Sequence, residues 1–141
     1  MNRFQYAFGL LILAQAAHSV EEYAGGLWES FPPARLLTGL FSENRERAFI
    51  ALNVALVAFG LWCFIWPIRR GWPSAALFAW IWVAVELING IVHPLWALRV
   101  SGYAPGVATA PVLLILAIWV LRESRRSPFT ATIPAPVVRK K

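Results

Sequence analysis

Four long apolar segments make up most of the 141-residue chain. They cover about residues 4–23, 47–66, 72–98 and 107–121, and each is close to the roughly 20 residues that a membrane-spanning helix needs. Lipid offers no hydrogen-bond partner to backbone N–H and C=O groups, so each segment is expected to be a helix. The sequence therefore predicts an all-α fold, a bundle of four transmembrane helices in a single domain over residues 1–121.

Charged residues are scarce and unevenly placed. They make up 14% of the chain, against about 25% in soluble domains. The net charge is +6, and six of the 13 Lys and Arg residues lie in residues 122–141, which we expect to form a basic, disordered tail. The basic residues sit between and after the apolar segments, a pattern typical of lipid headgroup contact. We therefore expect the lipid bilayer as a partner, and no nucleic acid.

The positions of the arginines predict an orientation. Arg69 and Arg70 follow the second span, residues 122–126 follow the fourth, and both places lie on one side of the membrane. The positive-inside bias assigns that side to the cytoplasm, and Arg3 agrees. The first loop also contains arginines and is an exception. The prediction is a multi-pass protein of the cell (inner) membrane, with both termini in the cytoplasm and the first and third loops outside.

Local signals predict where the helices end. Ser42 is a candidate cap for the second span, and Pro67 is expected to stop it after Trp66. Residues 34–41 are predicted to form a short amphipathic turn at the membrane surface. The first segment has a competing interpretation, because the triplet at residues 14–16 (Ala-Gln-Ala) resembles the cleavage site of a secretory signal.

Polar side chains inside the predicted spans are the candidate functional residues. A charged group at the bilayer centre costs about 2.5–3.5 kcal/mol on insertion scales, so such groups mark function by default. The candidates are Gln15, His18, Glu21 and Glu22 on the first span, Asn53 on the second, and Glu86, Asn89 and His93 on the third. With the predicted orientation, all of them fall in the outer half of the bundle. This agreement predicts one shared site that opens to one side of the membrane.

Helical spacing decides which of these side chains face one another. On the third span, spacings of three and seven place all three polar residues on one stripe. Glu21 and Glu22 point about 100° apart. Glu22 is expected to face inward because it continues the stripe of Gln15 and His18, while Glu21 faces either the site or water.

Two imidazoles and several carboxylates can form the ligand set of a metal ion, and such ligands suit Zn or Fe. The predicted metal ligands are His18, Glu22, Glu86 and His93, and the predicted catalytic or supporting residues are Glu21, Glu22, Asn53, Glu86 and Asn89. Without a metal, a buried carboxyl group can act as a general acid. Hydrogen bonding between helices remains a simpler role for the two asparagines.

The leading hypothesis is a membrane-embedded, metal-dependent enzyme, a hydrolase or oxidoreductase, that acts on a lipid or isoprenoid-like substrate. The first alternative is a metal-free isomerase or cyclase that uses the same carboxyl groups for acid/base chemistry. The second is a non-enzymatic protein for binding or transport of small molecules, or an accessory membrane subunit. Metal analysis separates the first hypothesis from the others.

Three motifs resemble those of a known family. Residues 18–22 (His-Ser-Val-Glu-Glu) match the H-x-x-E-E signature of the HXXEE domain family. Residues 103–106 (Tyr-Ala-Pro-Gly) match a Y-x-P-G motif of the same family, and His93 is the candidate for its second histidine. The resemblance implies no particular reaction. It does imply that Tyr103 belongs with the site, where its hydroxyl is expected to reach the pocket as part of a lid.

Overall fold

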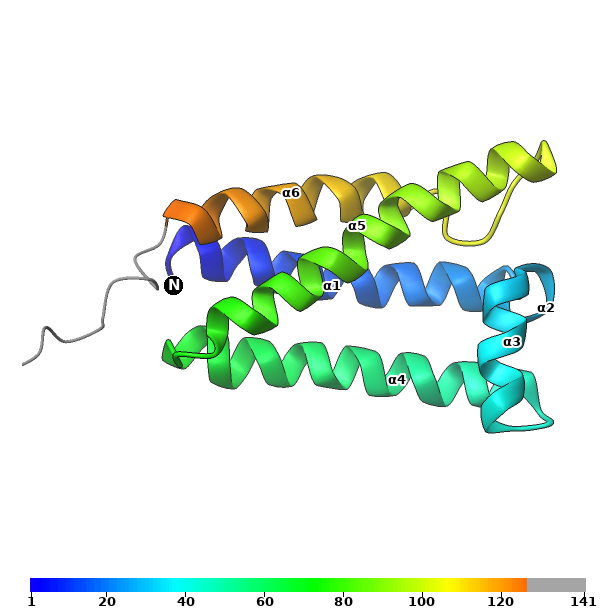
Figure 1. Cartoon of the computed structure of the whole chain (residues 1–141), viewed down its shortest axis with the longest axis horizontal. Helices are drawn as coiled ribbons and strands as arrows, with labels where there is room; N and C mark the ends of the chain where they lie inside the picture. Colours follow the sequence, from blue (N-terminus) through cyan, green and yellow to red (C-terminus); the bar gives the residue numbers. More distant parts are fainter. Residues whose placement is uncertain (127–141) are drawn as a thin grey trace, which may run out of the picture.

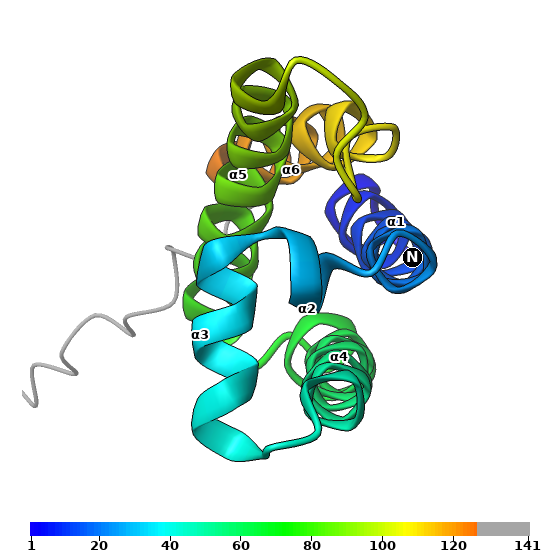
Figure 2. The ribbon, with the colours of Figure 1, turned by 90° about the vertical axis from the view of Figure 1, so that its right-hand side faces the viewer.

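The computed structural model describes residues 1–126, and this part of the chain consists of helices joined by turns and loops, with no strand. The helices are α1 (Arg3–Ala24), α2 (Leu27–Ser30), α3 (Pro32–Phe41), α4 (Arg45–Cys63), the π-helical turn η1 (Phe64–Ile68), α5 (Ala75–Val100) and α6 (Ala110–Arg126). The four long helices run along the long axis of the molecule (Figure 1). The two short helices, α2 and α3, cross one end of this bundle (Figure 2). The all-α prediction is confirmed.

Two helix ends differ from the prediction. Asn44, not Ser42, caps α4, and its side-chain oxygen accepts a 2.9 Å bond from the backbone N–H of Arg47. Ser42 instead accepts a bond from the Asn44 backbone N–H, so it shapes the turn before the cap. Pro67 does not stop the second long helix, because the last turn widens to the π-helical η1 and contains the proline. A wider turn changes which carbonyl faces the proline ring, and this avoids the usual clash.

The other long helices lie close to their predicted bounds. α5 begins three residues later than predicted, because Trp72 donates its N–H back to the Pro67 carbonyl and closes a tight turn. α6 begins at Ala110 and continues to Arg126, five residues past the predicted end. Arginines in a last helical turn interact favourably with the helix dipole, which explains the extension. The rest of the predicted disordered tail, residues 127–141, lies outside the described residues.

Apolar side chains fill the bundle where α1, α5 and α6 meet. Phe8 and Leu11 of α1 and Leu113 of α6 have no exposed surface. Trp82 of α5 lies against Gly60 of α4, where an added Cβ would come within 2.8 Å of the indole ring. This close packing holds the four long helices together. The buried His18 and Glu22 lie in the last two turns of α1, next to α2.

Two helical segments of the described chain are long and apolar enough to cross a membrane: α4 together with η1 (Arg45–Ile68), and α5 (Ala75–Val100). This supports membrane association. The chain start and the end of α6 lie at the same end of the bundle, opposite α2 and α3 (Figure 1). The arrangement of four spans with both termini in the cytoplasm stays a prediction.

Candidate metal centre

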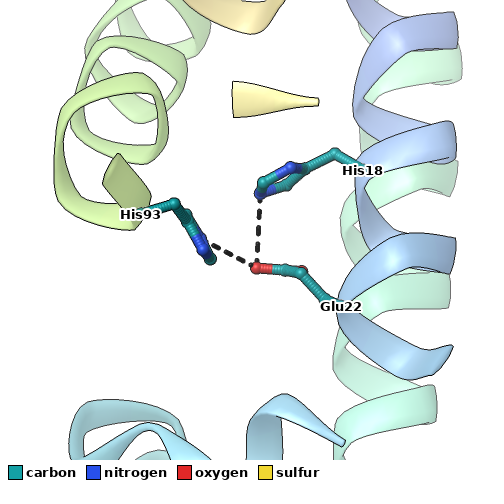
Figure 3. Close-up of side chains that lie close together, drawn as sticks. All are labelled: His18, Glu22 and His93. Atoms are coloured by element: carbon teal, nitrogen blue, oxygen red, sulfur yellow. Dashed lines mark ion pairs between the residues drawn. The ribbon is translucent and has the colours of Figure 1, made fainter. Parts of the chain in front are cut away.

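Three of the predicted ligands meet at the end of the bundle near α2 and α3. His18 and Glu22 lie one turn apart on α1, and His93 approaches them from α5 (Figure 3). Glu22 Oε1 lies 3.3 Å from His18 Nε2 and 3.2 Å from His93 Nε2. All three side chains are buried, with exposed fractions of 0%, 7% and 4% for His18, Glu22 and His93. The structure thus brings together residues that are 75 positions apart in the sequence.

The protonation of the His93 ring follows from its other nitrogen. His93 Nδ1 lies 2.6 Å from the backbone carbonyl oxygen of Pro105. A carbonyl oxygen can only accept a hydrogen bond, so Nδ1 must carry a proton and donate it. In the neutral ring, Nε2 then has a free lone pair. That lone pair faces the Glu22 carboxylate.

The His18 ring is fixed in the same way by a hydroxyl group. His18 Nδ1 lies 2.7 Å from Thr109 Oγ1, and this hydroxyl donates its own proton to Glu21 Oε2 at 2.6 Å. The hydroxyl therefore accepts from His18 Nδ1–H, and Nε2 is again the free nitrogen of the neutral ring. His18 Nε2 is buried and has no hydrogen-bond partner among the described residues. Buried nitrogens without a partner are rare and call for an explanation.

A divalent metal ion held by the three side chains would give His18 Nε2 a partner. One ligand atom from each of the three residues can be chosen so that all lie within 4.8 Å of one another. A tetrahedral ion with bonds of about 2.1 Å holds its ligand atoms about 3.4 Å apart, close to the two nitrogen–oxygen distances here. Two neutral imidazoles with their Nδ1–H groups anchored, plus one carboxylate, also match sites for Zn and non-haem Fe. The residues present therefore fit such an ion.

The loop of residues 103–106 builds the back of this site. Gly106 has a φ of +88°, and a Cβ atom there would lie 2.5 Å from His93 Nδ1 and 2.7 Å from His18 Cε1. Only glycine allows the backbone to pass so close to both rings. Pro105 packs against Gly25 at the end of α1, where an added Cβ would lie 2.6 Å from the proline side chain. The loop is thus pressed against α1 and both histidines.

Glu21 and Glu22 have different tasks. Glu22 faces the histidines, as the stripe on α1 predicts, whereas Glu21 holds the loop before α6. Glu21 Oε1 accepts bonds from Tyr103 Oη at 2.8 Å and from the Ala108 backbone N–H at 3.0 Å. Glu21 Oε2 accepts from the backbone N–H of Thr109 at 2.9 Å and from its hydroxyl. Glu21 therefore anchors the loop and, through Thr109, the His18 ring.

Tyr103 lies at the surface. Its side chain is 66% exposed, and its hydroxyl points to Glu21 and not to the three-residue centre. The hydrogen bond to the Glu21 carboxylate raises the pKa of Tyr103 above its usual value. The resemblance linked Tyr103 to the site as part of a lid. In the structure Tyr103 reaches the centre only indirectly, because its hydroxyl donates to Glu21 and Glu21 holds the loop next to the histidines.

Glu86 and the two asparagines form a second polar cluster, deeper in the bundle. Glu86 is completely buried, and Asn89 Nδ2 donates to it at 3.3 Å. The Gln15 amide, oriented with its nitrogen toward Glu86, donates at 2.8 and 3.1 Å. Ser19 Oγ lies 3.1 Å from the Gln15 amide oxygen and donates its single O–H to Asn53 Oδ1 at 2.6 Å. Glu86 precedes His93 by about two turns of α5 and is not part of the three-residue group.

Three contributors to the centre were missed by sequence reasoning. Thr109 and the Pro105 carbonyl orient the imidazoles, and Phe31 covers His93 with a ring distance of 6.2 Å. Only Pro105 had a signal in the sequence, since it belongs to the Y-x-P-G motif. A lone threonine and a loop phenylalanine carry no distinguishing pattern.

Comparison with known proteins agrees with the motifs. No curated protein and no solved structure gives a significant match to the chain. A family model described as "Protein of unknown function with HXXEE motif" matches residues 9–120, from the second turn of α1 to near the end of α6. This range contains all three ligands of the candidate centre and the loop that orients them. The chain therefore belongs to the HXXEE family.

Proposed function

We propose that His18, Glu22 and His93 bind a Zn or Fe ion, and that the protein is a membrane-embedded, metal-dependent enzyme acting on a lipid or isoprenoid-like molecule. One observation carries the proposal. Both imidazoles are held through Nδ1, so that both free Nε2 atoms face one Glu22 oxygen, and His18 Nε2 has no other partner in the described chain. Such a buried arrangement is costly unless a cation completes it.

The membrane setting of the proposal includes all four long helices. Large apolar side chains are exposed on the outward faces of α1 and α6 as well as on the two candidate spans. They include Leu10, Leu13 and Val20 on α1, Val54 and Leu61 on α4, Leu77, Ile88 and Ile91 on α5, and Val112 and Ile115 on α6. Exposed apolar surface of this extent is suited to lipid. With Arg69 and Arg70 on the cytoplasmic side, the centre lies in the half of the cell membrane facing outward.

The chain's own residues would have separate roles in this chemistry. Three protein ligands leave at least one coordination position open, where a bound ion would polarise a substrate oxygen or activate a water molecule. Thr109 and the Pro105 carbonyl keep the two rings in the ligating tautomer. The Phe31 ring covers His93 and limits the access of water to it. The buried Glu86, held by Gln15 and Asn89, offers a carboxyl group for proton transfer deeper in the bundle.

Glu86 also supports the second candidate function, a metal-free isomerase or cyclase. An acid with no exposed surface, surrounded by amide groups, has the setting of a buried general acid. In that case, the His18, Glu22 and His93 side chains would form an ion-paired group without a metal. The two candidates differ in whether the purified protein contains a metal ion.

Metal analysis of the purified full-length protein tests the proposal. We expect about one Zn or Fe per chain by inductively coupled plasma mass spectrometry, and its loss in His93→Ala and Glu22→Gln. Glu86→Gln is the matched control, because it removes one buried carboxylate outside the three-residue group and should retain the metal. Metal-free wild-type protein with an intact helical circular dichroism spectrum, after expression and titration with both metals, would contradict the proposal.

A further inference from the structure

A groove on the outer face of α5 adjoins the candidate metal centre. It has a volume of about 340 Å³ and is lined by Phe31, Val92, Leu95, Trp96 and Arg99. Four of these residues are apolar or aromatic, and one is charged. The volume is at the small end of the range for ligand pockets, so the groove suits one hydrocarbon chain better than two.

Arg99 provides the charge of this groove at the last turn of α5. The side chain is exposed, and its guanidinium lies 6.0 Å from the centre of the Trp96 ring. No carboxylate of residues 1–126 forms an ion pair with it. A guanidinium can bind a carboxylate or phosphate group through two parallel hydrogen bonds. The groove thus combines apolar walls with an unpaired cation at its end.

Phe31 connects this groove to the metal centre. The Phe31 ring lies 5.2 Å from the Trp96 ring and 6.2 Å from the His93 ring. One aromatic ring therefore both lines the groove and neighbours a predicted metal ligand. A second groove of similar size, which contains Arg47 and lies against α4, is lined by none of the three ligands or Phe31. Of these two grooves, the Arg99 groove is the one that shares Phe31 with the centre.

We propose that the Arg99 groove binds the substrate, and that the substrate is a single-chain amphiphile with an anionic head group. This inference rests on the proposed enzymatic function. The head group contacts Arg99, and the chain lies along Val92 and Leu95. Six residues of helix separate Arg99 from His93, which corresponds to about 9 Å along the axis. The reacting atoms are therefore expected about 9 Å from the head group, and Phe31 must turn aside to admit them.

A photoactivatable oleate with a diazirine in its chain tests this inference. The full-length protein is placed in phosphatidylcholine nanodiscs, and labelled positions are mapped by mass spectrometry. We expect labelling of residues 92–99 that excess unlabelled oleate prevents, and labelling at least about tenfold weaker with the matching uncharged alcohol. Arg99→Gln should reduce oleate labelling to the level of the alcohol. Arg47→Gln, which removes the same charge from the other groove, should leave it unchanged.

The outcomes separate this inference from the proposed function. Equal labelling by oleate and alcohol, or full labelling in Arg99→Gln, would overturn the inference even if the same nanodiscs contain stoichiometric metal. Arg99-dependent labelling of protein that never binds a metal would instead support the binding of an anionic ligand in the groove and contradict the proposed metal-dependent enzyme. If oleate labelling falls as much in Arg47→Gln as in Arg99→Gln, the inference is also overturned, because the effect of the positive charge would then not depend on which groove contains it.

Discussion

Thr109 is the residue whose substitution tests the geometry of the centre most directly. Its hydroxyl accepts a hydrogen bond from His18 Nδ1–H at 2.7 Å and donates one to Glu21 Oε2 at 2.6 Å. Thr109→Val keeps the shape of the side chain and removes both bonds. The backbone N–H of residue 109 still donates to Glu21, so the loop keeps part of its anchor.

The structure gives the size of the expected effect. Without the hydroxyl, the Nδ1–H group of the completely buried His18 is left unsatisfied, which costs about 1–3 kcal/mol. The ring can escape this cost by moving its proton to Nε2, where it would face Glu22 and occupy the lone pair that a metal needs. Either outcome weakens binding. We expect the Zn²⁺ affinity to fall by about 10- to 100-fold, or about 1.4–2.8 kcal/mol.

Competition titration measures this effect. The purified protein in detergent is titrated with Zn²⁺ against a chromophoric chelator, with circular dichroism to check that the helices are intact. Thr109→Ser is the matched control, because it retains the hydroxyl, and its affinity should stay within about threefold of wild type. If Thr109→Val binds Zn²⁺ as tightly as wild type, the hydroxyl does not orient His18 and the tautomer argument fails.

Two further predictions concern the loop before α6. Gly106→Ala should abolish metal binding and lower the melting temperature by several degrees, because its Cβ would lie 2.5 Å from His93 Nδ1 at a φ of +88°; an unchanged affinity would show that the loop can move away freely. Tyr103→Phe should change Zn²⁺ affinity less than about threefold, since Glu21 keeps its other donors. The pKa of Tyr103 is raised in the folded protein, so its hydrogen bond stabilises the fold below the unfolded-state pKa of about 10 and this stability is lost as pH rises through the folded-state pKa. Thermal unfolding of wild type and Tyr103→Phe from pH 8 to 11 should show a slightly higher melting temperature for wild type, and this difference should disappear at the alkaline end. A difference that persists or grows there would contradict the assignment.

The sequence predicted the helices well because their cause is local. Long apolar runs and breakers determine where a helix can form, and the four long helices were found within a few residues of their observed ends. The errors lie at helix ends whose position is set by a tertiary contact or by the geometry of a turn. Pro67 is a helix breaker by its own chemistry, yet a π-helical turn accommodates it. The choice of Asn44 over Ser42 as a cap depends on one turn of backbone that no propensity encodes.

The centre was predictable in part for a related reason. Helical spacing places His18 and Glu22 on one stripe of α1, and a histidine within a second predicted span is a strong signal in itself. Spacing along one helix, however, does not tell which of its residues lie at the same level as a given residue of another helix. Glu86 shares the stripe of His93, but about two turns of α5 separate them, so it joins Gln15 and Asn89 and not the metal group. Only the packing of α5 and α1 against α6 decides that level.

The H-x-x-E-E and Y-x-P-G segments of this chain act as one structural unit, and this explains why each contains the residues it does. The H-x-x-E-E segment supplies His18 and Glu22 to the centre and turns Glu21 toward the loop. The Y-x-P-G segment returns these contacts: its tyrosine binds Glu21, its proline carbonyl fixes His93, and its glycine allows both rings to approach the backbone. A loop that served only to connect α5 to α6 would need none of these three features. Their combination at one site is what a site with fixed imidazole orientations requires, because a metal ligand must hold its lone pair in place before the ion arrives.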